Sequence, residues 1–261
     1  MGVLDEIVAH KRSELAADKA ERPLAALVAA CRGLAPARDF AAALRPPAAE
    51  RVRLIAEVKR GSPSRGLFRA DLDPVAQATI YAGAGAAAVS VLTDAKYFHG
   101  SLDDLIAVRA AVPVPVLRKE FIVDEYQLWE ARAAGADAAL LIVAALDDEA
   151  LRDLLAAAKG VGLAPLVEVH TAAELDRALR VDPPVIGVNN RDLQTLRTSL
   201  EPSLALLPQI PPGHLAVSES GLASGTDVAR VVAAGAHAVL VGETLLRADD
   251  VTAKVRELSL R

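Results

Sequence analysis

The chain has 261 residues, a formal net charge of −5, 52% hydrophobic residues and a single cysteine. The length suits one α/β domain, because such domains can run to roughly 250 residues without dividing, and the acidic balance excludes a general nucleic-acid binder, which would carry a basic face. The lone Cys31 excludes an internal disulfide and a thiolate-rich metal site and favours the reducing cytoplasm.

Residues 1–50 are predicted to form a helical extension that packs on the rest of a single domain, 1–261. Apolar residues such as Ile7 and Leu15 recur at helical spacing, with charged residues between them. A second helical stretch covers 24–30. No apolar run approaches the about 20 residues that a membrane-spanning helix needs, so no membrane association is expected.

Short apolar runs alternate with helical segments through residues 51–261. The predicted strands are 54–58, 87–92, 114–118, 138–142, 164–168, 185–188, 215–218 and 238–241. Uniformly apolar strands suit a parallel sheet covered on both faces, and alternation with helices favours a (β/α)₈ barrel. The alternative is an open doubly wound sheet, which should carry a glycine-rich turn after its first strand. No G-x-G-x-x-G follows Lys59, and there is no P-loop.

Several predicted strands end in charged or amide side chains. Glu57 and Lys59 belong together, because residues i and i+2 of a strand point to the same side. The polar strand ends are Glu57, Lys59, Lys119, Glu168, Asn189 and Glu219. In a parallel barrel the C-terminal strand ends face one mouth, so these six side chains are expected to converge there. The alternative is a set of satisfied ion pairs that closes the barrel.

Two ammonium groups among three carboxylates predict general acid–base catalysis. Close packing and partial burial should push their pKa values apart, leaving one group protonated and another ionised. The five histidines are scattered, and no metal-ligand spacing occurs, so no metal is expected.

Small residues after the last two predicted strands indicate a phosphate site. Ser220 and Gly221 follow one strand, and Gly242 and Glu243 follow the other. Small residues let backbone N–H groups approach an anion, and a helix N-terminus adds a favourable dipole.

Apolar residues flank the polar strand ends and predict a wall for a flat substrate. They are Pro63, Phe98, Phe121 and Leu193. Flat ligands favour aromatic and aliphatic walls. The alternative is that these side chains only anchor their loops.

The chain resembles the indole-3-glycerol phosphate synthases of tryptophan biosynthesis over nearly its whole length. The motifs that carry the resemblance are Ile7-Val8-Ala9-His10-Lys11-Arg12, Glu57-Val58-Lys59-Arg60, Ser62-Pro63-Ser64, Lys96-Tyr97-Phe98, Leu117-Arg118-Lys119-Glu120-Phe121, Leu166-Val167-Glu168, Gly187-Val188-Asn189-Asn190-Arg191-Asp192-Leu193 and Ser218-Glu219-Ser220-Gly221. The resemblance implies a lyase that converts 1-(2-carboxyphenylamino)-1-deoxyribulose 5-phosphate to indole-3-glycerol phosphate with loss of carbon dioxide and water. It implies no cofactor, a monomer, and at most transient contact with other enzymes of the pathway.

The resemblance also implies residue roles. Lys119 would protonate the ribulose carbonyl, Lys59 would steer the substrate carboxylate, and Glu168 would assist proton transfer during dehydration. Glu57 and Asn189 would orient the lysines and sugar hydroxyls, with Glu219 in support. The implied substrate contacts are Ser62, Pro63, Phe98, Phe121, Arg191, Leu193, Ser220, Gly221, Gly242 and Glu243.

Two competing functions make different demands on the sequence. A phosphoribosylanthranilate-isomerase-like barrel would carry a cysteine at the end of its first strand, whereas Cys31 precedes the predicted barrel. A non-catalytic barrel that binds phosphorylated sugars would keep the small residues of the phosphate site but would not need the acid–base residues, and both sets are present.

Overall fold

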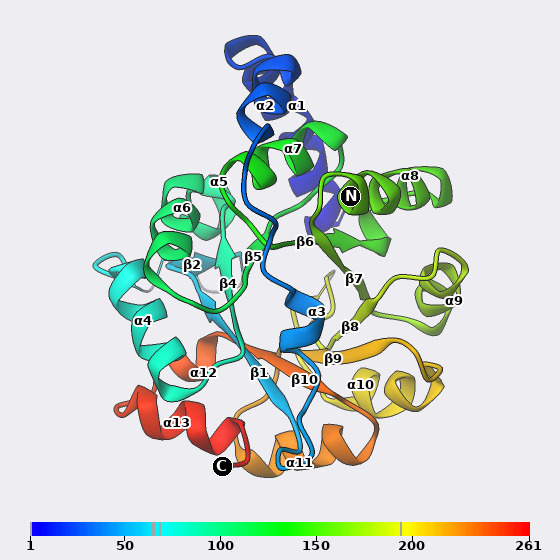
Figure 1. Ribbon diagram of the computed structural model, residues 1–261. Coiled ribbons are helices and arrows are strands. Elements are labelled where there is room, and N and C mark those ends of the chain that lie inside the picture. Colours follow the sequence, from blue (N-terminus) through cyan, green and yellow to red (C-terminus); the bar gives the residue numbers. More distant parts are fainter. Residues whose placement is uncertain (1, 64–65, 68, 194) are drawn as a thin grey trace.

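The computed structural model describes residues 2–63, 66–67, 69–193 and 195–261 of the chain, and its centre is a closed parallel barrel (Figure 1). The barrel strands are β1 (Arg53–Val58), β4 (Ala88–Leu92), β5 (Val116–Lys119), β6 (Ala138–Ile142), β7 (Ala164–Val169), β8 (Val185–Asn189), β9 (Leu215–Glu219) and β10 (Ala238–Val241). Strand β1 pairs with both β4 and β10, which closes the sheet. The predicted (β/α)₈ barrel is therefore confirmed, and the open doubly wound sheet is excluded.

Helices cover the outside of the barrel. They are α4 (Pro74–Ala84), α6 (Leu102–Ala111), α7 (Glu125–Ala133), α8 (Asp148–Gly160), α9 (Ala172–Arg180), α10 (Glu201–Leu206), α11 (Gly225–Ala233) and α13 (Val251–Leu258). Most begin at a residue whose side-chain oxygen accepts a hydrogen bond from a backbone N–H of the first turn, as Asp73 does for α4 and Ser224 for α11. Such caps satisfy donors that a helix leaves unpaired, so the capping residue determines where a capped helix starts.

Shorter elements lie between strands and helices. They are the helices α5 (Ala95–Phe98) and α12 (Glu243–Leu246), the 3₁₀ turns η1 (Val143–Ala145) and η2 (Leu207–Gln209), and the hairpin of β2 (Gly61–Ser62) and β3 (Gly66–Leu67). The hairpin, α5 and α12 follow the C-terminal ends of β1, β4 and β10, so they border the mouth of the barrel.

Aliphatic side chains fill the barrel interior. Ile55, Leu117, Leu140, Leu166 and Leu240 are all buried and belong to one cluster. A second cluster lies between the strands and the surrounding helices. Because each strand contributes side chains to both clusters, its residues are apolar almost throughout, as expected for a parallel sheet covered on both faces.

The N-terminal extension consists of α1 (Val3–Glu21), α2 (Leu24–Cys31) and α3 (Phe40–Ala43). Figure 1 shows α1 and α2 beside α7, where Leu15 and Leu27 pack against Tyr126. Phe40 of α3 is fully buried in the same cluster as the barrel interior. The two predicted helices are present. Among the described residues no helix is long and apolar enough to cross a membrane.

A buried ion cluster fastens the segment before α3 to the barrel. Asp137 is fully buried, and its carboxylate accepts hydrogen bonds from Arg109 Nε at 2.7 Å and from the backbone N–H groups of Arg38 and Val116 at 2.7 and 2.8 Å. Arg38 in turn donates to the Val112 carbonyl. A carboxylate removed from water is stable only with such partners, so Asp137 joins the extension, α6 and β5 at one point.

We expect Asp137→Ala to lower the free energy of unfolding by about 3–5 kcal/mol, because it leaves the partly buried Arg109 without its counter-charge. Urea denaturation followed by circular dichroism measures the loss. Asp148→Ala is the matched control, since Asp148 pairs with Arg177 and Arg180 on the surface and such pairs contribute little. Equal losses in the two variants would contradict the assigned role of the buried cluster.

Candidate active site

A cavity of about 620 Å³ opens at the C-terminal ends of the barrel strands. Apart from Ser62 and Pro63, every residue predicted for the site lines it: Glu57, Lys59, Phe98, Lys119, Phe121, Glu168, Asn189, Arg191, Leu193, Glu219, Ser220, Gly221, Gly242 and Glu243. Ser62 and Pro63 line a smaller cavity of about 70 Å³ that shares residues with the first. Ser64 lies outside the described residues. The predicted convergence on one mouth is therefore present.

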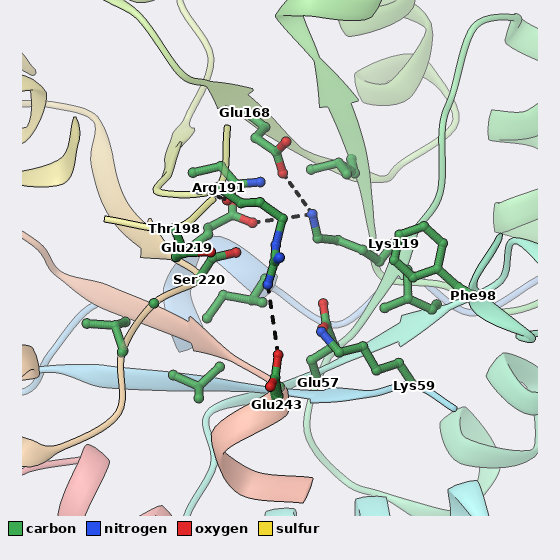
Figure 2. A pocket seen from close by; sticks show the side chains of 18 of the residues that line it. Glu57, Lys59, Phe98, Lys119, Glu168, Arg191, Thr198, Glu219, Ser220 and Glu243 are labelled. Atoms are coloured by element: carbon green, nitrogen blue, oxygen red, sulfur yellow. Dashed lines mark hydrogen bonds and ion pairs between the residues drawn. The ribbon is translucent and has the colours of Figure 1, made fainter. Parts of the chain in front are cut away.

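Lys119 lies between two buried carboxylates. Its Nζ is 2.7 Å from Glu168 Oε2 and 3.3 Å from Glu219 Oε2 (Figure 2). These side chains lie at or next to the C-terminal ends of β5, β7 and β9. Together with β1, which carries Glu57, these strands are every second strand around the barrel. Alternate strands of such a barrel send their side chains into the same interior layer, which brings the four groups together.

Two glycines make room for the carboxylates. A Cβ atom at Gly187, in the middle of β8, would overlap Glu219 Oε1. A Cβ atom at Gly242, after β10, would overlap Glu57 Oε1. Gly242 was expected in a phosphate site, and the role of Gly187 was not identified from the sequence. A glycine inside an apolar strand is the signal that was available, because it marks a close approach by another group.

Lys119 and Glu168 hold each other in the charged state. Burial opposes ionisation of both, but their mutual attraction outweighs it, so the pKa of Lys119 is raised and the pKa of Glu168 is lowered. His170 contributes to the second shift, since its Nε2 is 3.4 Å from Glu168 Oε1 and its Nδ1 is 3.1 Å from Glu174. Although burial disfavours its charge, the two carboxylates raise the pKa of His170 to about 10. Glu168 therefore lies between two cations.

The pKa of Glu219 is shifted upward, in the opposite direction to that of Glu168. Burial, reinforced by the negative charges of Glu168 and Glu57 and only partly offset by Lys119, raises its pKa to about 8. Its side chain is 1% exposed. At neutral pH the protonated form of Glu219 thus faces the ionised form of Glu168 across one ammonium group. This is the divergence of pKa values that the acid–base hypothesis required.

Lys59 forms a second ion pair at the same mouth. Its Nζ lies 2.6 Å from Glu57 Oε1, and Lys59 lines both cavities. Asn189 accepts a hydrogen bond from the backbone N–H of Arg191 at 3.0 Å, which shapes the start of the loop after β8. A cation and an amide thus flank the central group of Lys119 and its carboxylates.

The turns after β9 and β10 border one side of the cavity. Ser220 and Gly221 have φ angles of 65° and 77°, a left-handed backbone that is typical of turns whose N–H groups hold anions. Thr244 Oγ1 donates to the Leu222 carbonyl at 2.7 Å and so joins the two turns.

The carboxylate of Glu243 faces arginines. Its Oε1 is 3.1 Å from Arg247 Nε. Its Oε2 is 4.0 Å from Arg191 Nη2 (Figure 2). Its negative charge is thus countered beside the turns that were predicted to hold an anion. Arg247 and Thr198, which also line the cavity, were not identified from the sequence.

Aromatic and aliphatic side chains form the other side of the cavity. The rings of Phe98 and Phe121 lie 6.0 Å apart between centroids and are tilted by 39°. Helix α1 completes the smaller cavity with Val3, Leu4 and Ile7. The sequence indicated that the extension packs on the barrel, but not which of its residues would form a wall. Among the described residues, no group of histidine, cysteine, aspartate and glutamate could hold a metal ion.

Comparisons with known proteins agree on one family. A family model described as Indole-3-glycerol phosphate synthase matches residues 4–258. The indole-3-glycerol phosphate synthase of Laribacter hongkongensis is 51% identical over 258 residues, covering 98% of each chain. That of Acidithiobacillus ferrooxidans is 52% identical over 246 residues, covering 94% of each chain.

A solved structure supports the fold alone. The thiamine phosphate pyrophosphorylase of Pyrococcus furiosus superposes with a TM-score of 0.57 at 16% identity, covering 80% of this chain and 94% of the other. The function is better indicated by the relatives at about half identity, because they match nearly the whole chain. The chain belongs to the indole-3-glycerol phosphate synthase family.

Proposed function

We propose that the chain is a carboxy-lyase that converts 1-(2-carboxyphenylamino)-1-deoxyribulose 5-phosphate to indole-3-glycerol phosphate, without a cofactor. The observation that carries the proposal is the buried Lys119, whose Nζ lies 2.7 Å from Glu168 and 3.3 Å from Glu219. This group lies between the turns after β9 and β10 and the paired phenylalanines. The substrate has a phosphate at one end, a ketone in the middle and a benzoate ring at the other end.

The phosphate end of the substrate binds to the turns after β9 and β10. The left-handed backbone at Ser220 and Gly221 and the four-residue helix α12 that follows Gly242 support this assignment. Arg191 and Arg247 supply positive charge, and each already faces Glu243. The phosphate would compete with Glu243 for these guanidinium groups.

The ring end binds between Phe98 and Phe121, with Leu193 and Pro63 as further walls. The tilt and separation of the two phenylalanine rings support a site for a flat ring. Lys59 lines both cavities, and Ser62 lies in the smaller one, so the ring carboxylate would meet an ammonium and a hydroxyl group. Binding at both ends brings the ring carbon against the ketone in the middle, which is how positioning lowers such a barrier.

Ring closure uses Lys119 as the acid. The ring carbon that bears the carboxylate attacks the ketone carbon, and the carbonyl electron pair moves to oxygen, which takes a proton from Lys119. The bond to the carboxylate then breaks, carbon dioxide leaves, and the bonding pair restores the aromatic ring. Glu219, protonated at neutral pH, can return a proton to Lys119.

Dehydration completes the indole. The nitrogen lone pair expels the hydroxyl group, which leaves as water with a proton from Lys59. Glu168, held ionised by its two cationic neighbours, removes a proton from the carbon next to nitrogen. Glu57 and Asn189 orient Lys59 and the sugar hydroxyls. The complete reaction consumes one proton, because a carboxylate leaves as neutral carbon dioxide.

We further propose that residues 1–261 act as one domain and as a monomer in the cytoplasm. The extension 1–50 contributes Val3, Leu4 and Ile7 to the smaller cavity, which supports a single functional unit. The single cysteine is typical of a reducing compartment.

We expect Lys119→Ala to lower kcat by about 10²–10⁴-fold, because the ketone oxygen loses its proton donor. Indole fluorescence after mixing with the substrate measures turnover. Lys159→Ala, which removes a lysine on the outer helix α8, is the control and should keep wild-type turnover. Near-normal kcat in Lys119→Ala would remove this residue from the acid role, and substrate binding by wild type without turnover would favour a non-catalytic barrel.

We expect Gly221→Ala to raise KM roughly tenfold with a smaller change in kcat. Its φ of 77° strains any side chain, and a Cβ atom there would come within 2.7 Å of Thr198 Cγ2, so the phosphate turn must shift. Gly83→Ala is the matched control, because that glycine lies within helix α4 with open space around it. An unchanged KM in Gly221→Ala would argue against phosphate binding at this turn.

We expect Glu219→Gln to stabilise the protein relative to wild type increasingly as pH rises from 5 to 9. The folded pKa of about 8 exceeds the ordinary 4.5, so the favourable contribution of the protonated form is complete below pH 4.5 and is lost as pH approaches and passes 8. Glutamine keeps the neutral form throughout. Melting temperatures of both proteins across this range measure the difference. The exposed Glu149→Gln should show no such trend, and parallel curves for Glu219→Gln would exclude the raised pKa.

A further inference from the structure

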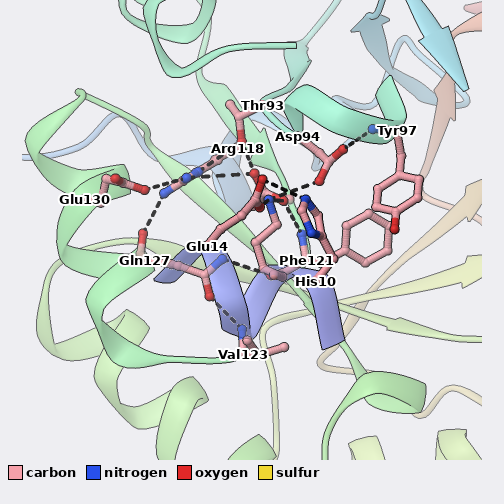
Figure 3. Close-up of polar contacts among 12 residues, drawn as sticks. His10, Glu14, Thr93, Asp94, Tyr97, Arg118, Phe121, Val123, Gln127 and Glu130 are labelled. Carbon is pink, nitrogen blue, oxygen red and sulfur yellow. Dashed lines mark hydrogen bonds and ion pairs between the residues drawn. The ribbon is translucent and has the colours of Figure 1, made fainter. Parts of the chain in front are cut away.

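Helix α1 carries a lysine whose side chain is buried against the barrel. Lys11 is 7% exposed, and its Nζ lies 2.8 Å from Glu14, 3.0 Å from Asp94 and 3.3 Å from Glu120. Figure 3 labels two of these partners, Glu14 and Asp94. Burial opposes its charge, but the three carboxylates outweigh burial and raise its pKa. An ammonium ion from the extension thus meets the ends of β4 and β5.

One of its partners fixes the segment that carries Phe98. Asp94 is fully buried just after β4, and its Oδ1 accepts a hydrogen bond from the backbone N–H of Tyr97 at 2.7 Å, which caps α5. Its carbonyl also accepts from Gly100 at 2.9 Å. Phe98 is the last residue of this four-residue helix, so the position of its ring depends on Asp94.

The other partner fixes Phe121. Glu120 Oε1 accepts from the Phe121 backbone N–H at 2.9 Å, and Glu120 Oε2 accepts from Thr93 Oγ1 at 2.8 Å. Gln127 Nε2 donates to the Phe121 carbonyl at 2.9 Å. The backbone of Phe121 is thus held on both sides, and one side is the carboxylate that faces Lys11.

Resting on the function proposed above, we infer that Lys11 is a positioning residue for the substrate ring. Its ammonium draws Asp94 and Glu120 together and thereby sets the separation of Phe98 and Phe121. The ring site then forms only when α1 is docked. Helix α1 also supplies the aliphatic wall of the smaller cavity. Docking of α1 on the barrel therefore forms the Lys11 ion pairs and that wall at the same time.

If Lys11 only held α1 against the barrel, any other ion pair between α1 and the barrel would affect the ring site in the same way. Lys19, two turns further along the same helix, also pairs with the barrel, at 2.6 Å from Asp124, the residue that caps α7. That pair is partly exposed, and neither member lines either cavity. Lys19 is therefore a matched control for Lys11: the same helix, the same charge and an ion pair to the barrel, without contact to the phenylalanine segments.

The test compares Lys11→Met with Lys19→Met in the full chain, using two probes that bind opposite ends of the site. Anthranilate reports on the ring end through its own fluorescence, and inorganic phosphate reports on the other end by calorimetry. We expect Lys11→Met to weaken anthranilate roughly tenfold, the effect of losing one good aromatic contact, and to leave phosphate within about twofold. Lys19→Met should change neither, and KM for the whole substrate should rise more than kcat falls in Lys11→Met.

Unchanged anthranilate affinity in a folded Lys11→Met protein would overturn the inference, as would equal weakening of both probes, which indicates general loosening. If Lys11→Met does not fold, Lys11→Arg, which keeps the charge but changes its geometry, is measured in the same way, and weakening of both probes or of neither again refutes the role. Because anthranilate binding is read without turnover, failure of the proposed reaction in wild type is a separate result.

Discussion

A buried ammonium shared by two carboxylates is the interaction on which the rest of this barrel depends. Removing an ammonium and a carboxylate from water is unfavourable unless the two groups lie close together and their remaining hydrogen-bonding capacity is met. Lys119 and Glu168 lie 2.7 Å apart, because alternate strands bring them, together with Glu219, into one layer. Strand β8 lies between β7 and β9, and its residue beside the Glu219 side chain has to lack a Cβ atom. Gly187 occupies that position. The chemistry of the mouth thus limits which residues the neighbouring strands can carry.

The unequal surroundings of the two carboxylates give them different chemistry. Glu168 is close to Lys119 and to His170, whereas Glu219 shares Lys119 with it and faces further negative charge. Two groups of the same type therefore settle on opposite protonation states at neutral pH. His170 is anchored in turn by Glu174, which lies on helix α9 outside the strand layer. The acid–base asymmetry is thus built from the surrounding helices as well as from the barrel.

Local sequence patterns predicted the barrel and the polar layer but not the long-range contacts. Strand ends such as Glu57 and Lys119 follow from an apolar run and a period of two residues, both of which a short window contains. The hairpin β2–β3 and the four-residue helix α3 are too short for periodicity to reveal. Lys11 has no local signal either, because a charged residue on an amphipathic helix ordinarily faces solvent. Its burial depends on acidic residues more than eighty positions away.

The two ends of the cavity are fixed by different parts of the chain. Thr244 joins the turn after β10 to the turn after β9 by its hydrogen bond to Leu222, so the proposed phosphate end is formed by neighbouring strands. The proposed ring end takes Phe98 and Phe121 from the segments after β4 and β5, and α1 contributes a further wall. A substrate whose ring must react with its own ketone gains rate only when both ends are held at once. In the reaction proposed above, the barrel supplies the acid and base groups, and the N-terminal helix completes the cavity in which the ring is held.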